Sequence, residues 1–230
     1  MTLGLTKIRL ERQRSMRDQI YDLLRAQIVT GAIPPSGVID EKKIAAQLKV
    51  SRTPVREAVK KLSDEHLVEV VAQSGTRAAP LDRSELHQAY IVRRALETES
   101  AAQAVVHMSQ DHADHLSDLL MRHGRFIDSK DYLNAIATDD AFHRYIAEMS
   151  NLPRLWRAIE ISKAQLDRCR HLALPHPGEA DATLDQHRKI IRSLNSGDPE
   201  IARGTMAEHL DKAYSNAIKL LDRQLEPHSS

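Results

Sequence analysis

The sequence predicts a mainly α-helical protein built from a small N-terminal module, residues 1–80, and an all-α antiparallel helical bundle, residues 81–230. Apolar residues recur at helical spacing through most of the chain, whereas β-prone stretches occur only between residues 67 and 79. Charge changes at the same point, because residues 1–80 carry 14 Lys and Arg against 9 Asp and Glu, and residues 81–230 carry 19 against 23. We therefore expect a basic module, suited to a polyanion, joined to a larger acidic domain.

The N-terminal module is predicted to be a helix-turn-helix followed by a two-stranded hairpin. Its elements are helices over 15–30, 41–48 and 51–65 and strands over 67–72 and 76–79. Gly31 stops the first helix, and Asp40 and Ser51 can cap the two that follow. Gly75 lies in the hairpin turn, and residues 80–83 serve as the linker.

The rest of the chain is predicted to be helical. Amphipathic stretches are separated by glycine and proline breakers, and the loops are short enough for antiparallel neighbours in a bundle. The predicted helices lie near 84–108, 111–128, 130–149, 153–174, 179–196 and 199–225.

The composition excludes several classes of protein. With 41% apolar and 28% charged residues, the 230-residue chain is typical of a globular protein. No stretch approaches the roughly 18 uncharged apolar residues that a membrane-spanning helix needs, so we expect a cytoplasmic protein with no membrane partner. The single cysteine, Cys169, fits a reducing compartment and excludes a metal cluster held by cysteines alone.

The second helix of the helix-turn-helix carries residues suited to DNA. In the winged arrangement this helix enters the major groove, and the hairpin touches the neighbouring backbone. Ser51 and Thr53 can donate to a phosphate at the helix N-terminus. Arg52 and Arg56 stand one turn apart at the end that meets base edges, where arginine reads guanine. Lys42, at the start of the preceding helix, is a predicted phosphate contact; the alternative for all these charges is a solvated surface.

Residues 15–80 resemble the winged helix-turn-helix of the GntR family of bacterial transcriptional regulators. The likeness is carried by the segment 51–59, SRTPVREAV, and by the turn 30–35, TGAIPP. It implies that DNA is contacted by Lys42, Ser51, Arg52, Thr53, Arg56 and Gly75. The sequence departs from the family pattern at Lys49 and His66, where glycine is common, and in the wing, where Gln73-Ser74 precedes the glycine instead of a basic residue.

Four side chains in the predicted bundle form a candidate metal site. Asp139 and His143 are four residues apart, so they share one face of a helix. His187 and His209 lie on consecutive helices, about ten residues before and eleven after the turn near Gly197, so an antiparallel hairpin brings them to the same height. Three imidazoles and a carboxylate suit zinc or nickel better than magnesium. On the residues alone, packed or capped histidines remain the alternative.

Residues 84–225 resemble the helical effector-binding domain, called FCD, of the FadR branch of the same family. Its metal-containing members have an Asp and a His one turn apart followed by two distant histidines, and its opening is similar to residues 92–97, VRRALE. The resemblance implies that Asp139, His143, His187 and His209 hold a divalent transition metal, zinc first and nickel or manganese as further candidates. It also implies that a small organic acid binds over the metal.

Two more residues are candidates for that effector pocket. Arg93 shares a helix face with apolar residues, so it is expected to point into the bundle and to meet a metal-bound carboxylate; the alternative is an ion pair with Glu97 at i+4. Asn216, seven residues after His209, shares its face, with packing or exposure as equal alternatives. The other histidines suggest no ligand set: His66, His87, His107, His112, His115, His123, His171, His176 and His228.

The function predicted from these features is that of a homodimeric transcription factor. It binds double-stranded operator DNA of inverted-repeat symmetry and responds to a small organic acid, with repression as the commoner behaviour of the family. One alternative is a regulator whose metal is structural or is itself the signal. A metal-dependent enzyme is the other alternative, and it is not expected because no positioned nucleophile or base accompanies the four ligands.

Overall fold

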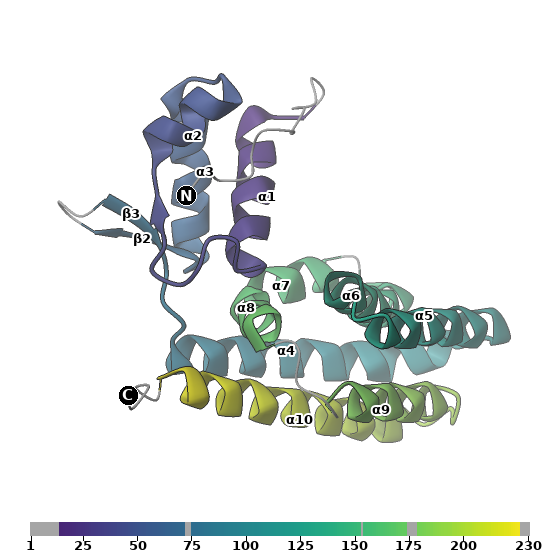
Figure 1. Ribbon diagram of the computed structural model, residues 1–230. Helices are drawn as coiled ribbons and strands as arrows, with labels where there is room; N and C mark the ends of the chain where they lie inside the picture. Colours follow the sequence, from purple (N-terminus) through teal and green to yellow (C-terminus); the bar gives the residue numbers. More distant parts are fainter. Residues whose placement is uncertain (1–13, 72–74, 153, 174–178, 226–230) are drawn as a thin grey trace. The chain divides into compact units, whose positions relative to one another are not determined.

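The computed structural model describes residues 14–71, 75–152, 154–173 and 179–225 (Figure 1). The chain divides into two compact units, residues 1–82 and residues 83–230. As the sequence predicts, the protein is mainly α-helical. In the described ranges, no helix combines the length and the apolar character needed to cross a bilayer.

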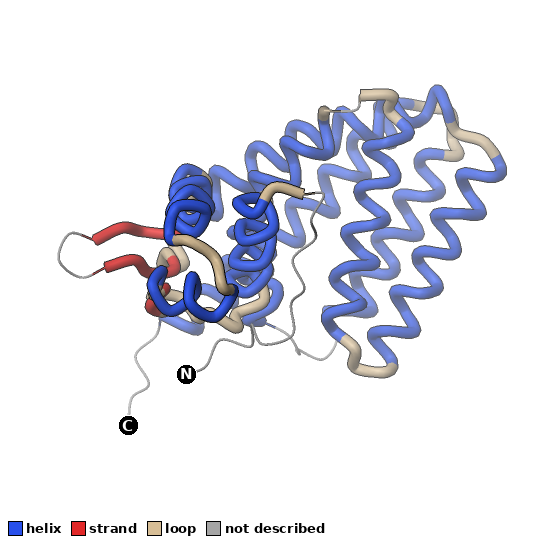
Figure 2. The backbone as a smooth tube through the Cα atoms, turned by 90° about the horizontal axis from the view of Figure 1, so that it is seen from above, coloured by secondary structure: helices blue, strands red, loops and turns tan. Residues whose placement is uncertain are grey.

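The first unit contains a helix-turn-helix and a small sheet. Its elements are α1 (Met16–Val29), β1 (Val38–Ile39), α2 (Glu41–Leu48), α3 (Arg52–Asp64), β2 (Val68–Val71) and β3 (Gly75–Ala78). The predicted two-stranded hairpin is a three-stranded antiparallel sheet in the order β1-β3-β2, drawn in red in Figure 2. The added strand, β1, has only two residues, too few to show a period-2 pattern in the sequence.

Local caps and an apolar core hold this unit together. The side chain of Asp40 accepts a hydrogen bond from the backbone N–H of Lys43 at 3.0 Å, as expected for the α2 cap. Helix α1 packs on α3, and the residues they bury are apolar. These buried residues include Ile20, Leu24, Ile28, Val55, Val59 and Leu62.

The second unit is a helical bundle. Its elements are α4 (Arg83–Ala104), the 3-10 turn η1 (Val105–His107), α5 (Gln110–Asp128), α6 (Tyr132–Met149), α7 (Leu155–Ser162), α8 (Ala164–Ala173), α9 (Glu179–Leu194) and α10 (Pro199–Leu225). Helices α4 and α10 run side by side, and so do α5 and α6 (Figure 1).

One predicted helix of the bundle, over residues 153–174, is wrong, because the described residues of this stretch form two helices, α7 and α8, that separate at Lys163. Lys163 is buried and its Nζ donates to Asp140 on α6 at 2.7 Å. This tertiary contact lies 23 residues away in the sequence, so the amphipathic pattern carries no signal of the break.

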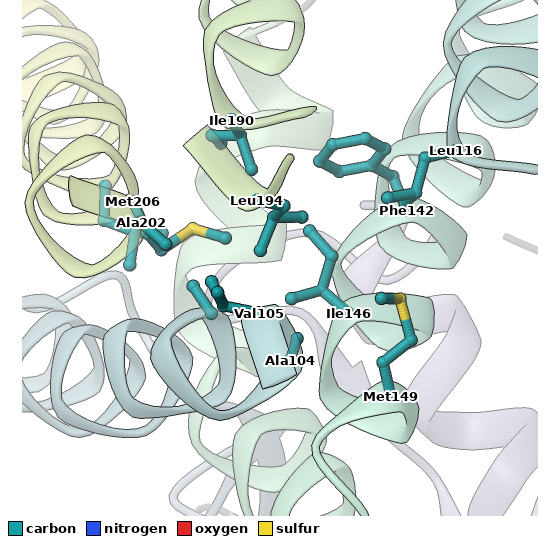
Figure 3. Packing of buried hydrophobic residues seen from close by; sticks show 12 residues of the cluster. Ala104, Val105, Leu116, Phe142, Ile146, Met149, Ile190, Leu194, Ala202 and Met206 are labelled. Atoms are coloured by element: carbon teal, nitrogen blue, oxygen red, sulfur yellow. The ribbon is translucent and has the colours of Figure 1, made fainter. Parts of the chain in front are cut away.

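An apolar cluster fills the interior of the bundle (Figure 3). Leu116 of α5, Phe142 and Ile146 of α6, and Ile190 and Leu194 of α9 point toward one another there. Phe142 continues this packing toward the polar interior, because its ring stacks on that of His187 with centroids 4.3 Å apart. The apolar cluster therefore supports one side of the histidine site described below.

Candidate DNA-binding surface and candidate metal centre

The exposed face of α3 carries four of the six predicted DNA contacts. Ser51, Arg52, Thr53 and Arg56 are all exposed, while the opposite face of the helix is buried. Ser51 is the N-cap residue, but its side chain makes no capping hydrogen bond to the helix. Its hydroxyl and the first backbone N–H groups of α3 are therefore positioned to meet a phosphate.

The other two predicted contacts lie on α2 and on the wing formed by β2 and β3. Lys42 is exposed in the first turn of α2, and Gly75 is exposed with a φ of +85°, a backbone conformation that favours glycine. Thr76 fixes the wing to α2, because its Oγ1 donates to Oε1 of Glu41 at 3.0 Å. Gln73 and Ser74 lie outside the described residues.

The predicted metal ligands come together from three helices, α6, α9 and α10. Donor atoms of His143, His187 and His209 lie within 4.8 Å of one another. The Nε2 atoms of His143 and His209 are 3.2 Å apart, and Nε2 of His187 is 3.5 Å from Oδ1 of Asp139. All four side chains are buried, with residue exposures between 0% and 5%.

A fifth residue, His123 of α5, belongs to the same cluster. Donor atoms of His123, Asp139 and His187 form a second set within 4.8 Å of one another, sharing His187 with the first. The sequence reasoning missed His123 because its position depends on how α5 packs against α9. The sequence did carry one signal: His123 falls on the same face of α5 as Leu116, Leu119 and Leu120, so a buried position could be expected for it.

The electrostatics of the cluster favour metal-binding protonation states. Burial lowers the pKa of His187 and of His209 well below the usual value and lowers that of His123. Burial alone would raise the pKa of Asp139, but Arg170, whose Nη2 lies 2.7 Å from Oδ2, brings it well below its usual range. Neutral imidazoles and an ionised carboxylate are the forms that bind metals.

The unsatisfied atoms of the cluster also fit a cation. Neither ring nitrogen of His187 has a hydrogen-bond partner among the described residues, although the ring is fully buried. Buried polar atoms in native proteins are normally paired, and a metal ion would accept the lone pair of one of these two nitrogens. The residues present therefore fit a divalent transition metal.

A second layer of contacts orients two of the histidines. Oε2 of Glu97 lies 2.6 Å from Nδ1 of His143, and Nδ1 of His209 is hydrogen-bonded to Oε1 of Gln186 at 2.8 Å. Such outer partners fix the ring orientation and the tautomer of a ligating histidine. Burial would raise the pKa of Glu97, but the charge of Arg93 lowers it well below its usual range, so the carboxylate is ionised.

The structure shows Arg93 in the alternative arrangement that the sequence left open. Arg93 is buried and points into the bundle, and its Nε donates to Oε1 of Glu97. Asp140, next to Asp139 in the chain, accepts hydrogen bonds from Lys163 and Arg170.

A cavity opens beside the histidine cluster. Both predicted effector residues, Arg93 and Asn216, line it, together with the predicted ligands Asp139 and His209. Its wall is partly apolar, with Ile127, Ile136 and Leu166. Arg170 adds a second guanidinium to this wall. Its ion pair with Asp139 joins residues 31 positions apart, so the sequence alone does not reveal it.

A helix-turn-helix with arginines on the exposed face of its second helix, followed by a wing, defines a DNA-binding transcriptional regulator. Residues 16–77 match the family model "Bacterial regulatory proteins, gntR family", and residues 88–212 match that of the FCD domain. The chain belongs to the GntR family of bacterial regulatory proteins, with an FCD domain as its C-terminal unit.

Relatives over nearly the full length support this assignment. An uncharacterized HTH-type transcriptional regulator of Streptomyces ambofaciens is 30% identical over 207 residues, covering 90% of this chain and 87% of the relative. The HTH-type transcriptional repressor RspR of Escherichia coli is 28% identical and covers 86% of each chain. The solved structure of E. coli McbR/YncC has the same fold, with a TM-score of 0.77, 24% identity, and coverage of 92% and 99%. These relatives are regulators and not enzymes.

Proposed function

We propose that the protein is a cytoplasmic, homodimeric repressor whose affinity for operator DNA is controlled by a small organic acid. In this proposal Asp139, His143, His187 and His209 hold a divalent transition metal, and the acid binds in the adjoining cavity. One observation carries the proposal: two of these ligands line the same cavity as Arg93 and Asn216.

The chemistry of the cavity favours a small carboxylate. When bound, the metal supplies positive charge and coordination positions for a carboxylate oxygen. Arg93 and Arg170 add guanidinium groups that match carboxylate geometry, while Ile127 and Ile136 offer an apolar surface to the rest of the molecule. Asn216 is half-buried and can bond a hydroxyl or carbonyl oxygen.

On the DNA side, Arg52 and Arg56 are proposed to read base edges and Lys42, Ser51 and Thr53 to hold phosphates, with Gly75 allowing the wing to approach the backbone. A dimer presents two recognition helices, so its operator is expected to be an inverted repeat. The acid and the operator are coupled, and the factor by which one changes the affinity of the other must be the same in both directions.

The first test combines metal analysis with calorimetry. Protein purified without chelator is expected to contain about one transition-metal ion per chain, and His187→Ala is expected to lose it. The metal-loaded protein is then titrated with dicarboxylates, hydroxy acids and sugar acids. Heat with at least one compound supports the proposal. Metal without heat from any compound supports the alternative in which the metal is structural or is itself the signal.

A matched pair of variants tests the arginine. Arg93→Ala is expected to lose affinity for the acid found by calorimetry while keeping the metal. Arg94→Ala serves as the control, because Arg94 is the next residue in the chain and its partly exposed side chain pairs with Asp211. Unchanged affinity in Arg93→Ala removes this residue from the effector site. The coupling to DNA is measured separately, on an operator selected in vitro from random sequences. The same acid is expected to weaken binding of the protein to this operator, as for a repressor relieved by its effector.

A further inference from the structure

We infer that His123 is a fifth protein ligand of the metal, so that the site selects an ion that accepts five or six ligands, such as Ni²⁺ or Co²⁺. The inference rests on the proposed metal site and adds to it a residue from a fourth helix, α5. It replaces the tetrahedral zinc that four ligands would suggest with a site of higher coordination number.

The environment of His123 points to a ligand. The residue is 6% exposed, and its Nδ1 has no hydrogen-bond partner in the described part of the chain. A donor atom of its ring lies within 4.8 Å of donor atoms of both Asp139 and His187, and its ring centroid is 5.8 Å from that of His187. An unpaired nitrogen at such a buried position is explained by a lone pair that faces a cation.

The packing of α5 holds His123 toward α9. Next to it in the chain is Gly124, where an added Cβ would lie 3.6 Å from Cδ1 of Leu184, one turn before His187 on α9. The apolar neighbours Leu119 and Leu120 are buried on the same side of α5. The imidazole is therefore fixed against the bundle interior by its backbone, and no rotation of an exposed side chain is needed to bring it to the cluster.

The two sets of donors share His187 but are otherwise separate, so a single ion that binds all five donors must draw the two sets closer together. Around an ion with bonds of about 2.1 Å, neighbouring donors are about 3.0 to 3.4 Å apart and opposite donors about 4.2 Å apart. The observed separations are 3.2 Å between His143 and His209, 3.5 Å between His187 and Asp139, and at most 4.8 Å within either set. Because His187 belongs to both sets, an ion bound to it lies beside both, and the donors must approach to within about 4.2 Å of one another to bind it together.

A fifth donor changes which metal the site prefers and how much room it leaves. Four imidazoles and one carboxylate form a nitrogen-rich set, which suits nickel and cobalt better than manganese, whose preference is for oxygen. Five protein donors leave one position on a six-coordinate ion. A single carboxylate oxygen of an effector, or a water molecule, fits that position.

The test is the visible absorption of Co²⁺ bound to the full-length protein. Wild type is expected to show the weak bands of five- or six-coordinate cobalt. His123→Leu is expected to show the stronger bands of tetrahedral cobalt and an affinity lower by at least about tenfold. His115→Ala, an exposed histidine eight residues earlier on α5, is the matched control and should behave as wild type in both respects.

Two further measurements keep the outcomes separate. His187→Ala tests the metal site itself: if wild type binds no Co²⁺, the proposed metal and this inference both fail. If wild type binds Co²⁺ and His187→Ala does not, an unchanged spectrum and affinity in His123→Leu overturn the inference alone. Thermal unfolding of the metal-free variants checks their folding, and His123→Gln is measured in parallel in case the leucine variant is unfolded.

Discussion

The two units place their candidate functional residues in opposite environments. In the N-terminal unit, Lys42, Arg52 and Arg56 are exposed over an apolar core, whereas in the C-terminal unit His143 and His187 are buried beside the core. The difference reflects the size of the proposed ligand. A DNA duplex is bound by charges on the protein surface, whereas a metal ion is bound by side chains that surround it. Function is therefore separable from stability in the first unit and is coupled to it in the second.

The largest expected effect comes from the buried pair of Arg93 and Glu97. Glu97→Gln leaves Arg93 buried without its counter-charge, so the free energy of unfolding of the metal-free protein is expected to fall by about 3 kcal/mol. The contact to Nδ1 of His143 also loses its charge, and metal affinity should fall by about 10- to 100-fold. Chemical denaturation followed by the fluorescence of the single tryptophan, Trp156 on α7, measures the first effect.

The matched control is an exposed ion pair on the same helix. Glu99 of α4 pairs with Arg203 at 2.6 Å, with side chains 40% and 37% exposed. Glu99→Gln should lower the free energy of unfolding by about 0 to 1 kcal/mol and leave metal affinity unchanged. Equal losses in the two variants would contradict the coupling of site and stability in this unit.

Acidification should destabilise the metal-free C-terminal unit. Burial lowers the pKa of His187 and of His209, so in the pH range below about 6.5 the unfolded chain takes up protons at these positions and the folded chain does not. Stability present above pH 6.5 is therefore lost as the pH falls, by up to about 1.4 kcal/mol per pH unit for each histidine. Denaturation curves at pH 7.5 and pH 5.5, again followed by Trp156, measure the loss.

Bound metal should make the free energy of unfolding depend more steeply on pH, because protons compete with the ion for the same nitrogens.

In the metal-free state, the free energy of unfolding of a His209→Gln variant is expected to depend less steeply on pH than that of wild type. A slope that is the same in the variant would show that His209 is not held neutral by burial.

In the N-terminal unit, Arg56→Ala should separate binding from folding. Loss of a bidentate contact to guanine costs about 1 to 3 kcal/mol of binding free energy, while an exposed helix position should change stability by no more than about 0.5 kcal/mol. Fluorescence anisotropy with a selected operator and with a scrambled duplex measures the effect. Lys42→Ala is the control for a phosphate contact: it should weaken binding to both duplexes and reduce the salt dependence. Equal losses on both duplexes for Arg56→Ala would make it a phosphate contact too.

What the sequence could predict follows the range of the interactions involved. The buried face of α3 is set within a few helical turns, so periodicity was enough to anticipate it. The pairing of Arg93 with Glu97 is equally local, and the sequence offered it only as the alternative to an effector contact. His187 and His209 were placed together by counting residues across one turn. His123 could not be placed, because its neighbours on α9 follow from the packing of two helices that are not consecutive in the chain. Arg170 is 31 residues from Asp139 and escaped prediction for the same reason.

The smallest expected effect tests whether the N-terminal unit carries local strain. Lys49, at the C-terminus of α2, has a φ of +55°, a conformation in which a side chain is disfavoured and glycine is usual. Lys49→Gly is therefore expected to raise the free energy of unfolding by about 1 kcal/mol, and Lys49→Ala, which keeps a Cβ, should not. Thermal unfolding of the two variants compares them. Both variants remove the same charge, so equal changes in stability would be assigned to the lysine side chain instead of the backbone. A difference in DNA affinity between the two variants would show that the strained turn positions α3.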